Sequence, residues 1–194
     1  MGGCRFSVER LVTNYFCPTV LDFEASGFAS DSYPIEVGVV TYEGERYCSL
    51  IEPQTHWHHW DKGAEQLHGI SRVQLHNAGR SVRSVCEQLN DLLAGHQVYS
   101  DAWVWDQRWL ITLYDAARMQ PSYTFSPIES IVTEQQLQKW DKEKQHVFKS
   151  VGGARHRAST DAYVIQQTYL NTRSDGVLVS AAPKLVPRVR AGRA

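Results

Sequence analysis

Two acidic residues stand at the end of a short apolar run, in the sequence TVLDFEASG at positions 19–27. Because successive side chains of a β-strand alternate between its two faces, Asp22 and Glu24 point the same way. Two carboxylates held side by side repel each other unless a positive charge lies between them, and a divalent cation with oxygen ligands is a common solution. This stretch therefore predicts a strand that presents a pair of acids, and it favours a metal site at the end of that strand.

The Asp-x-Glu spacing alone is weak evidence, because the chain contains a second copy. Asp141, Lys142 and Glu143 repeat the spacing, and the frequencies of Asp and Glu predict roughly half an occurrence by chance. The second copy lies in a charged stretch with a helical pattern, and no apolar strand leads into it. Asp22 and Glu24 are therefore the better candidates for a functional pair, and further acids elsewhere in the chain are needed to support them.

Composition and charge describe an ordinary globular chain. Its 194 residues, 42% hydrophobic and 21% charged, can form one domain with a sizeable core. The net charge of -1 gives no overall attraction for a polyanion, so affinity for nucleic acid must come from local patches, metals or stacking. The scattered cysteines and the absence of a signal-length or membrane-length apolar run predict a soluble, cytoplasmic protein with reduced thiols and no membrane partner.

Hydrophobic periodicity predicts alternating strands and helices, which is typical of an α/β sheet with helices on both faces. The clearest helix covers residues 81–94, where apolar residues recur at helical spacing up to Gly95. The predicted order is a strand at 18–24, a hairpin at 35–42 and 46–51, the helix at 81–94, a strand at 97–100, a helix at 106–119, a strand within 122–132, and helices at 133–148 and 158–171.

The two ends of the chain lack this periodicity. Residues 1–17 predict a loosely ordered leader, and residues 172–194, which are basic and contain two prolines, predict a disordered tail with unspecific affinity for nucleic acid. The folded domain is therefore expected at residues 18–171.

Three histidines and two tryptophans occupy residues 56–60, with the sequence HWHHW. Such side chains can bind zinc or stack on bases. No cysteine and no histidine pair at i, i+4 supports a zinc site here. A packed surface loop is the simpler interpretation, and a substrate-contacting loop is the alternative.

Two further acids can join the first pair. Asp106 follows the strand at 97–100, and Asp161 lies in the first turn of the last helix, beside its apolar stripe. Asp101 lies nearer the strand and is a rival for the metal role, but Asp106 is preferred because it stands at the start of a helix. For Asp161 the simpler alternative is helix capping, since acids favour first turns.

His156 lies between two glycines and the helix that carries Asp161. Glycines allow a loop to move, so His156 could approach the site that Asp161 supports. An imidazole, with an ordinary pKa near ~6.5, suits a general base that takes a proton from the attacking water.

The ordered set Asp22-x-Glu24, Asp106 and His156-x-x-x-x-Asp161 resembles the three motifs of the DEDDh 3′-to-5′ exonucleases, the DnaQ-like or ribonuclease T-like superfamily. The sequence AEQLHGIS at residues 64–71 also resembles the His-Gly-Ile segment that lines the terminal-nucleotide pocket in this family. The matches span residues 18–171, most of the chain. One departure is Asp101, which precedes the second-motif acid where many members have Asn.

The resemblance implies a ribonuclease H-like fold, with a central five-stranded mixed sheet flanked by helices on both faces and an antiparallel second strand. It also implies two Mg2+ or Mn2+ ions. The implied metal ligands are Asp22, Glu24, Asp106 and Asp161, the implied general base is His156, and the implied nucleotide-binding residues are Ser26, Gly27, Phe28 and His68.

The activity implied by the resemblance is hydrolysis of single-stranded DNA, RNA or short oligonucleotides from the 3′ end, releasing nucleoside 5′-monophosphates. The motifs do not choose between these substrates, because the 2′-hydroxyl is read by contacts outside them. A family member that binds nucleic acid or protein without cutting is an alternative, and a zinc hydrolase that uses the histidines of residues 56–60 is another. A homodimer is compatible with the sequence.

Overall fold

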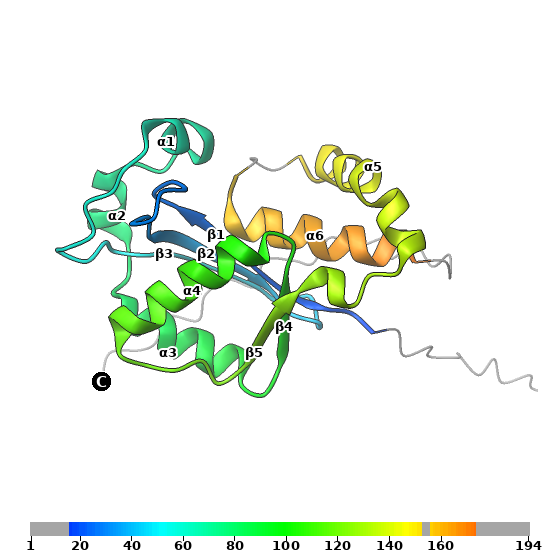
Figure 1. Ribbon diagram of the computed structural model, residues 1–194, viewed down its shortest axis with the longest axis horizontal. Helices are drawn as coiled ribbons and strands as arrows, with labels where there is room; N and C mark the ends of the chain where they lie inside the picture. Colours follow the sequence, from blue (N-terminus) through cyan, green and yellow to red (C-terminus); the bar gives the residue numbers. More distant parts are fainter. Residues whose placement is uncertain (1–15, 153–155, 174–194) are drawn as a thin grey trace, which may run out of the picture.

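A five-stranded mixed sheet forms the centre of the molecule, whose computed structural model describes residues 16–152 and 156–173 (Figure 1). Strand β2 pairs antiparallel with both β1 and β3, whereas β4 lies parallel to β1 and β5. The mixed sheet with an antiparallel second strand is therefore confirmed. The strands, in the order β3-β2-β1-β4-β5 across the sheet, are β1 (Thr19–Ala25), β2 (Pro34–Val40), β3 (Arg46–Leu50), β4 (Gln97–Ser100) and β5 (Thr124–Pro127).

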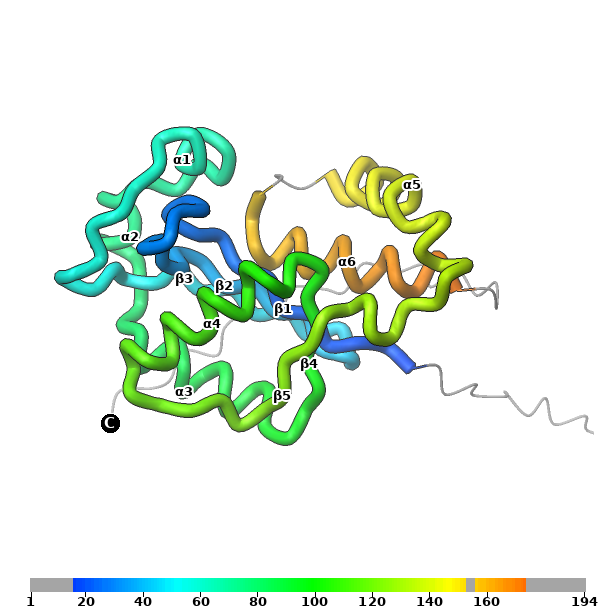
Figure 2. The backbone as a smooth tube through the Cα atoms, in the orientation of Figure 1, coloured from blue at the N-terminus to red at the C-terminus, as the bar shows by residue number. Residues whose placement is uncertain are grey.

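Helices cover both faces of this sheet, as predicted. On one face Leu21 and Phe23 of β1 join a buried cluster with apolar residues of α3 and α4, and on the other Val20 joins a cluster with residues of α5 and α6. Figure 2 shows α3 and α4 on one side of the strands, with α5 and α6 on the other. The helices are α1 (Lys62–His68), α2 (Arg72–Ala78), α3 (Val82–Leu93), α4 (Trp103–Ala117), α5 (Glu134–Val151) and α6 (Ala158–Thr172), with a short 3-10 helix η1 (Ile128–Ser130).

Helices α1 and α2 are missing from the predicted order, in which the hairpin leads directly to the helix at 81–94. Each has only seven residues, too few to display an apolar period. Their ends are set by local caps: the Asp61 carboxylate accepts the N–H groups of Gly63 and Ala64, and the Ser71 hydroxyl accepts that of Gln74. A second difference is that α4 begins at Trp103, so Asp106 lies in its first turn rather than at its start.

Most of the predicted leader and of the predicted basic tail lies outside the described residues, as does Gly153 before His156. Thr172 still belongs to α6, one position beyond the predicted end. Within the described ranges, no helix combines the length and the apolar character that crossing a membrane requires.

Candidate active site

Strand β1 presents Asp22 and Glu24 on the side of the sheet that α6 covers. Leu21 and Phe23 belong to the cluster on the opposite side, as the alternation of strand side chains predicts. Strand β4 pairs with β1 only at Thr19 and Val20, so the two acids lie where these neighbouring strands separate. Such a position, at the carboxyl ends of parallel strands, is where open α/β sheets bind ligands.

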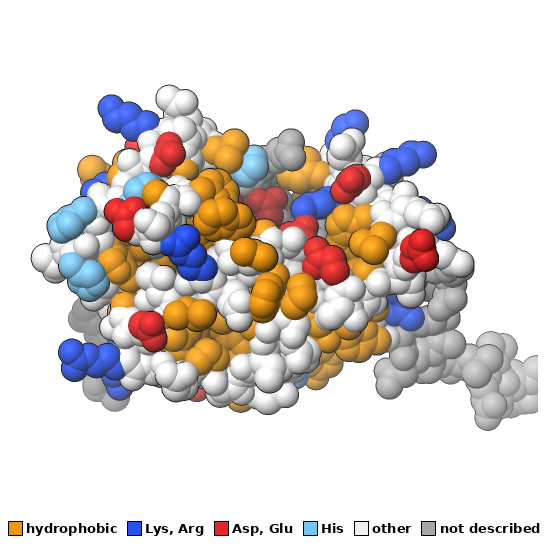
Figure 3. All heavy atoms as spheres, viewed as in Figure 1, with side chains coloured by type: hydrophobic (Ala, Val, Ile, Leu, Met, Phe, Trp, Pro, Cys, Tyr) orange, Lys and Arg blue, Asp and Glu red, His pale blue; other side chains and the backbone are white. Residues whose placement is uncertain are grey.

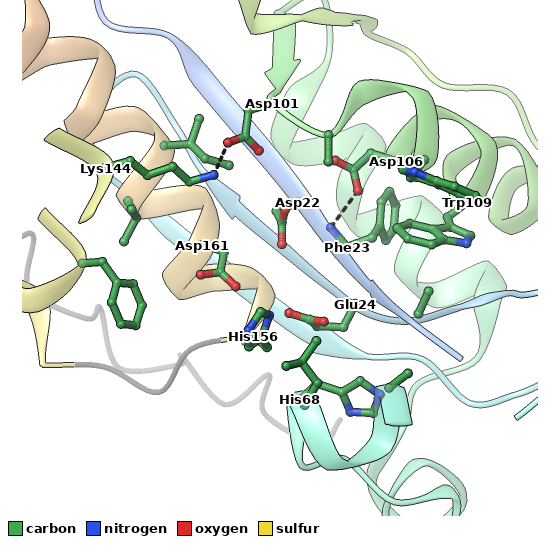
Figure 4. A pocket seen from close by; sticks show the side chains of 18 of the residues that line it. Asp22, Phe23, Glu24, His68, Asp101, Asp106, Trp109, Lys144, His156 and Asp161 are labelled. Atoms are coloured by element: carbon green, nitrogen blue, oxygen red, sulfur yellow. Dashed lines mark hydrogen bonds and ion pairs between the residues drawn. The ribbon is translucent and has the colours of Figure 1, made fainter. Parts of the chain in front are cut away.

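Three potential ligands converge beside this strand. One ligand atom each from Glu24, His156 and Asp161 all lie within 4.8 Å of one another, and no other group of three or more His, Cys, Asp or Glu residues in the described ranges meets that condition. Figure 4 shows the carboxylates of Asp22, Glu24 and Asp161 around one space, with His156 at its edge. The first and third motifs, far apart in sequence, are thus brought together.

Asp106 lies beside the edge of β1 from which β4 has separated, and both of its carboxylate oxygens accept hydrogen bonds. Its Oδ1 accepts the backbone N–H of Phe23 at 3.3 Å, and its Oδ2 accepts the hydroxyl of Ser100. The side chain is buried, at 1% exposed. Asp106 thereby links α4 to the edge of β1 beyond the point where β4 stops pairing with it. Asp106 does not belong to the group formed by Glu24, His156 and Asp161.

Asp101, the rival in the second motif, is paired with a cation. The ammonium of Lys144, on α5, donates to Asp101 Oδ2 (Figure 4). Asp101 thus bridges the start of α4 to α5.

The crowded acids raise one another's pKa. Burial, followed by the charges of Asp106, Asp161 and Glu24, holds the pKa of Asp22 well above its ordinary value. Burial and then Asp161 raise the pKa of Glu24 to about 8. Burial raises the pKa of Asp106 to about 7, although the bond from Ser100 lowers it.

These shifts mean that the carboxylates carry their full charge at neutral pH only with a compensating cation. Carboxylate oxygens are the ligands that Mg2+ and Mn2+ prefer, and an imidazole suits Zn2+. The donor set therefore fits a divalent metal.

A cavity of about 690 Å3 lies over the acids. Figure 3 shows acidic side chains in a hollow of this face, with hydrophobic side chains on both sides. Its floor comes from β1 and α6, and its walls come from α1, α4 and α5. The lining includes Asp22, Glu24, Gly27, Phe28, Leu67, His68, Asp101, Trp105, Asp106, Trp109, Lys144, Phe148, His156 and Asp161.

His68 offers an unused hydrogen-bond donor at this cavity. Its Nδ1 accepts the backbone N–H of Ile70 at 3.0 Å, which assigns the ring proton to Nε2. His68 is only 6% exposed, and its Nε2 has no hydrogen-bond partner among the described residues. Burial lowers the pKa of His68, so the ring stays neutral. A buried polar atom left unpaired is costly, and a ligand would remove that cost.

Ser26, Gly27 and Phe28, which the resemblance implies as nucleotide-binding residues, are placed differently from one another. Ser26 is not among the described residues that line the cavity, because its hydroxyl accepts the N–H of Tyr33 and lies 3.1 Å from His59 Nδ1. Gly27 lines the cavity at a φ of 140°, and a Cβ there would lie 2.6 Å from His59 Cε1. Phe28 is 60% exposed at the cavity wall, with its ring 5.1 Å from that of Trp105.

The segment at residues 56–60 packs against the domain. Trp57 is stacked on Tyr33 at 4.9 Å between ring centroids, and Trp60 Nε1 donates to Glu65 at 2.8 Å. Its histidines belong to no metal-ligand group among the described residues. The segment's contacts agree with a packed loop, with His59 buttressing Ser26.

Glu36 and Arg157 position the site but were absent from the predicted set. The Arg157 guanidinium binds both oxygens of the fully buried Glu36 carboxylate, which also accepts the N–H of Ala158 at 3.0 Å. This contact fixes the first turn of α6, which carries Asp161. The available signal was a lone carboxylate in the apolar strand PIEVGVV, because a buried charge needs a partner.

Gly38 lets α6 begin directly against β2. A Cβ at Gly38 would lie 2.1 Å from the backbone N of Ser159 and 2.2 Å from the carbonyl C of Ala158. We expect Gly38→Ala to displace the first turn of α6 and to lower the free energy of unfolding by about 1–3 kcal/mol, the usual cost of overpacking. Thermal unfolding with Gly63→Ala as the matched control checks this, since a Cβ at Gly63 would meet only a side-chain oxygen. Equal stability of both variants and the wild type would contradict it.

No protein-family model matches the chain. Among curated proteins, mouse dynein axonemal heavy chain 2 is 32% identical over 72 residues, which make up 37% of this chain and 2% of that protein. A match to so small a share of a relative assigns neither a family nor an activity.

Solved structures of exonuclease I from E. coli resemble the chain in fold. The complex with a dA16 oligonucleotide gives a TM-score of 0.61 at 15% identity, covering 81% of this chain and 41% of that one. The zinc-bound form of the exonuclease complex with single-stranded DNA gives 0.62 at 15% identity, covering 82% and 41%. This chain thus spans about two fifths of the exonuclease. At this identity the likeness concerns the fold, and the chain has the α/β, ribonuclease H-like fold of these structures.

Proposed function

We propose that residues 18–171 form a metal-dependent 3′-to-5′ exonuclease domain of the DEDDh type, which hydrolyses single-stranded DNA, RNA or short oligonucleotides to nucleoside 5′-monophosphates. The observation that carries this proposal is the convergence of Glu24, His156 and Asp161 within 4.8 Å beside Asp22. The fold shared with exonuclease I, solved with single-stranded oligonucleotides, supports it at the level of architecture.

The acids of this site would hold Mg2+ or Mn2+. Asp22, Glu24 and Asp161 surround the space in which an ion would be bound, and Asp106 lies close enough to raise the pKa of Asp22. When bound, the ions would polarise the scissile phosphate and neutralise the charge that develops on it. His156, at the edge of this space, would accept the proton of the attacking water.

The cavity walls would hold the last nucleotide of the strand. The unpaired Nε2–H of His68 is a donor for a sugar or base oxygen, and the exposed ring of Phe28 offers a stacking surface. Together they would place a free 3′ end against the acids, which would explain the direction of cleavage.

We expect 5′-labelled oligomers to shorten stepwise with Mg2+ or Mn2+, and 3′-labelled oligomers to release a labelled mononucleotide in the first turnover. Excess chelator should abolish both reactions. Ca2+, which takes more ligands at longer distances, should allow binding without efficient cutting. Gel analysis of DNA and RNA oligomers in parallel checks the direction, the product and the substrate. Full activity in chelator, or loss of nucleotides from the 5′ end, would contradict the proposal.

A binding protein of the same fold that does not cut is the second candidate, and one observation favours it. Both oxygens of Asp106 already accept hydrogen bonds, and Asp101 is paired with Lys144. If these bonds persist, the second-motif acids contribute little to a metal site. Tight oligonucleotide binding with no cleavage in Mg2+ or Mn2+ would establish this second function.

A further inference from the structure

One face of α5 forms a wall of the cavity, and the residues of this wall have no role in the mechanism proposed above. Asp141, Lys144, Gln145, Phe148 and Lys149 all line the cavity, at the spacing of residues that share one side of a helix. This wall comes from a different element than the acids of β1 and α6. It carries the two lysines among the described residues that line the cavity.

Lys144 reaches from this wall toward the acids. Its ammonium pairs with Asp101, and the two side chains are 40% and 13% exposed. Burial lowers the pKa of Lys144, but the charges of Asp101, Asp22 and Asp161 outweigh burial and raise it, so the side chain stays charged. In Figure 4 the ammonium lies between Asp101 and the space in front of Asp161.

The opposite wall is aromatic. Phe28 lies with its ring 5.1 Å from Trp105 and 5.8 Å from Trp109, and all three line the cavity. Aromatic side chains stack on bases, whereas cations follow the phosphates of a single strand. The two walls therefore suit the two sides of a nucleotide: bases against α4 and phosphates against α5.

The acidic lining of the cavity favours a cation on the wall along which phosphates would lie. Phosphate groups would be repelled by its carboxylates, and metal ions on the floor would offset this only near β1 and α6. The carboxylates that line the cavity are Asp22, Glu24, Asp101, Asp106, Asp141 and Asp161. An ammonium has three donors on a flexible stem, so Lys144 can keep its bond to Asp101 and still donate to a phosphate.

We propose that Lys144, oriented by Asp101, binds a phosphate group of a single-stranded nucleic acid along α5. The proposal rests on the function proposed above and adds the side of the cavity along which the backbone of the strand lies.

The test measures binding of a fluorescent single-stranded DNA with a cleavage-resistant 3′ linkage, in Ca2+, at several salt concentrations. We expect Lys144→Gln to weaken binding about tenfold and to reduce the slope of log K against log salt by about 0.7, the value for one phosphate contact on a single strand. Lys144→Arg, which keeps the charge, should restore most of the slope. Lys142→Gln is the matched control, because Lys142 lies on the same helix, is exposed and does not line the cavity.

The outcomes separate this proposal from the function on which it rests. A folded Lys144→Gln variant that binds with the wild-type affinity and salt slope overturns the role of Lys144. If the wild-type protein still cleaves oligonucleotides, the proposed exonuclease function is unaffected by that result. Equal losses in the Lys142 and Lys144 variants also overturn it, because the effect is then one of general charge. A wild-type protein that neither binds nor cuts overturns both proposals. Should Lys144→Gln fold poorly, Lys144→Met, which keeps an unbranched stem, provides the same comparison.

Discussion

Asp22→Asn is expected to lower the rate of cleavage by roughly a thousandfold or more, since a bound metal contributes several kcal/mol and each 1.4 kcal/mol is tenfold in rate. Asp22 lies between Glu24, Asp106 and Asp161, whose charges all raise its pKa. Replacing its carboxylate with an amide removes a charged ligand from the centre of the site. Single-turnover assays in Mn2+ measure the effect.

The same variant should be more stable than the wild type in metal-free buffer. The folded state raises the pKa of Asp22 above its ordinary 3.8 and that of Glu24 from 4.5 to about 8. Above pH 4 the folded protein therefore binds more protons at these groups than the unfolded chain does, and the free energy of unfolding falls as pH rises toward 8. Asp22→Asn removes one of these groups, so its Tm should fall less with pH.

Asp141→Asn is the matched control for both measurements. Asp141 belongs to the second Asp-x-Glu and is exposed on α5, and although it lines the same cavity, it is not in the group formed by Glu24, His156 and Asp161. It should retain most activity. Loss of cleavage in Asp141→Asn together with unfolding of Asp22→Asn would show that the wrong acidic pair had been chosen. For the second motif, comparing the cleavage rates of Asp101→Asn and Asp106→Asn shows which of the two acids the reaction needs.

His156→Ala is expected to lower turnover by roughly a hundred to ten thousand fold, the range for losing a general base. Its contribution as a base requires a free imidazole, so the acidic limb of the pH–rate profile should change in the variant. Oligonucleotide affinity should change little. Rate measurements from pH 5 to 9, at saturating substrate, check both expectations.

Metal titration separates this role from a ligand role. A ring nitrogen of His156 lies within 4.8 Å of carboxylate oxygens of Glu24 and Asp161, close enough for the three to share one ion. If His156 acts only as a base, His156→Ala should bind the metal almost as tightly as the wild type. If His156 is a metal ligand, the variant should lose metal affinity. A variant that cuts at the wild-type rate with an unchanged pH profile would contradict both roles and would weaken the third-motif resemblance, including Asp161.

The alternation of side chains in strands and the helical spacing of apolar residues made much of the fold predictable from the sequence. The alternation in β1 placed Leu21 and Phe23 opposite Asp22, and the helical spacing of residues 81–94 corresponds to α3. Helices α1 and α2 were not predicted, because their ends are set by caps and they are too short to show an apolar period. The ion pairs Glu36–Arg157 and Asp101–Lys144 were not predicted either, because contacts between residues of different elements produce no periodic pattern in the sequence.

The sequence by itself determined the five strands, the four longer helices α3 to α6 and the side of β1 that carries its acids, because hydrophobic periodicity and side-chain alternation are local properties. Tertiary structure alone decided that Glu24 meets His156 and Asp161, that Asp106 turns its oxygens to Phe23 and Ser100, and that α5 brings Lys144 to Asp101. These contacts depend on where β4 separates from β1 and on how closely α6 approaches Gly38. Such packing is set by the whole core, so no single stretch of sequence encodes it.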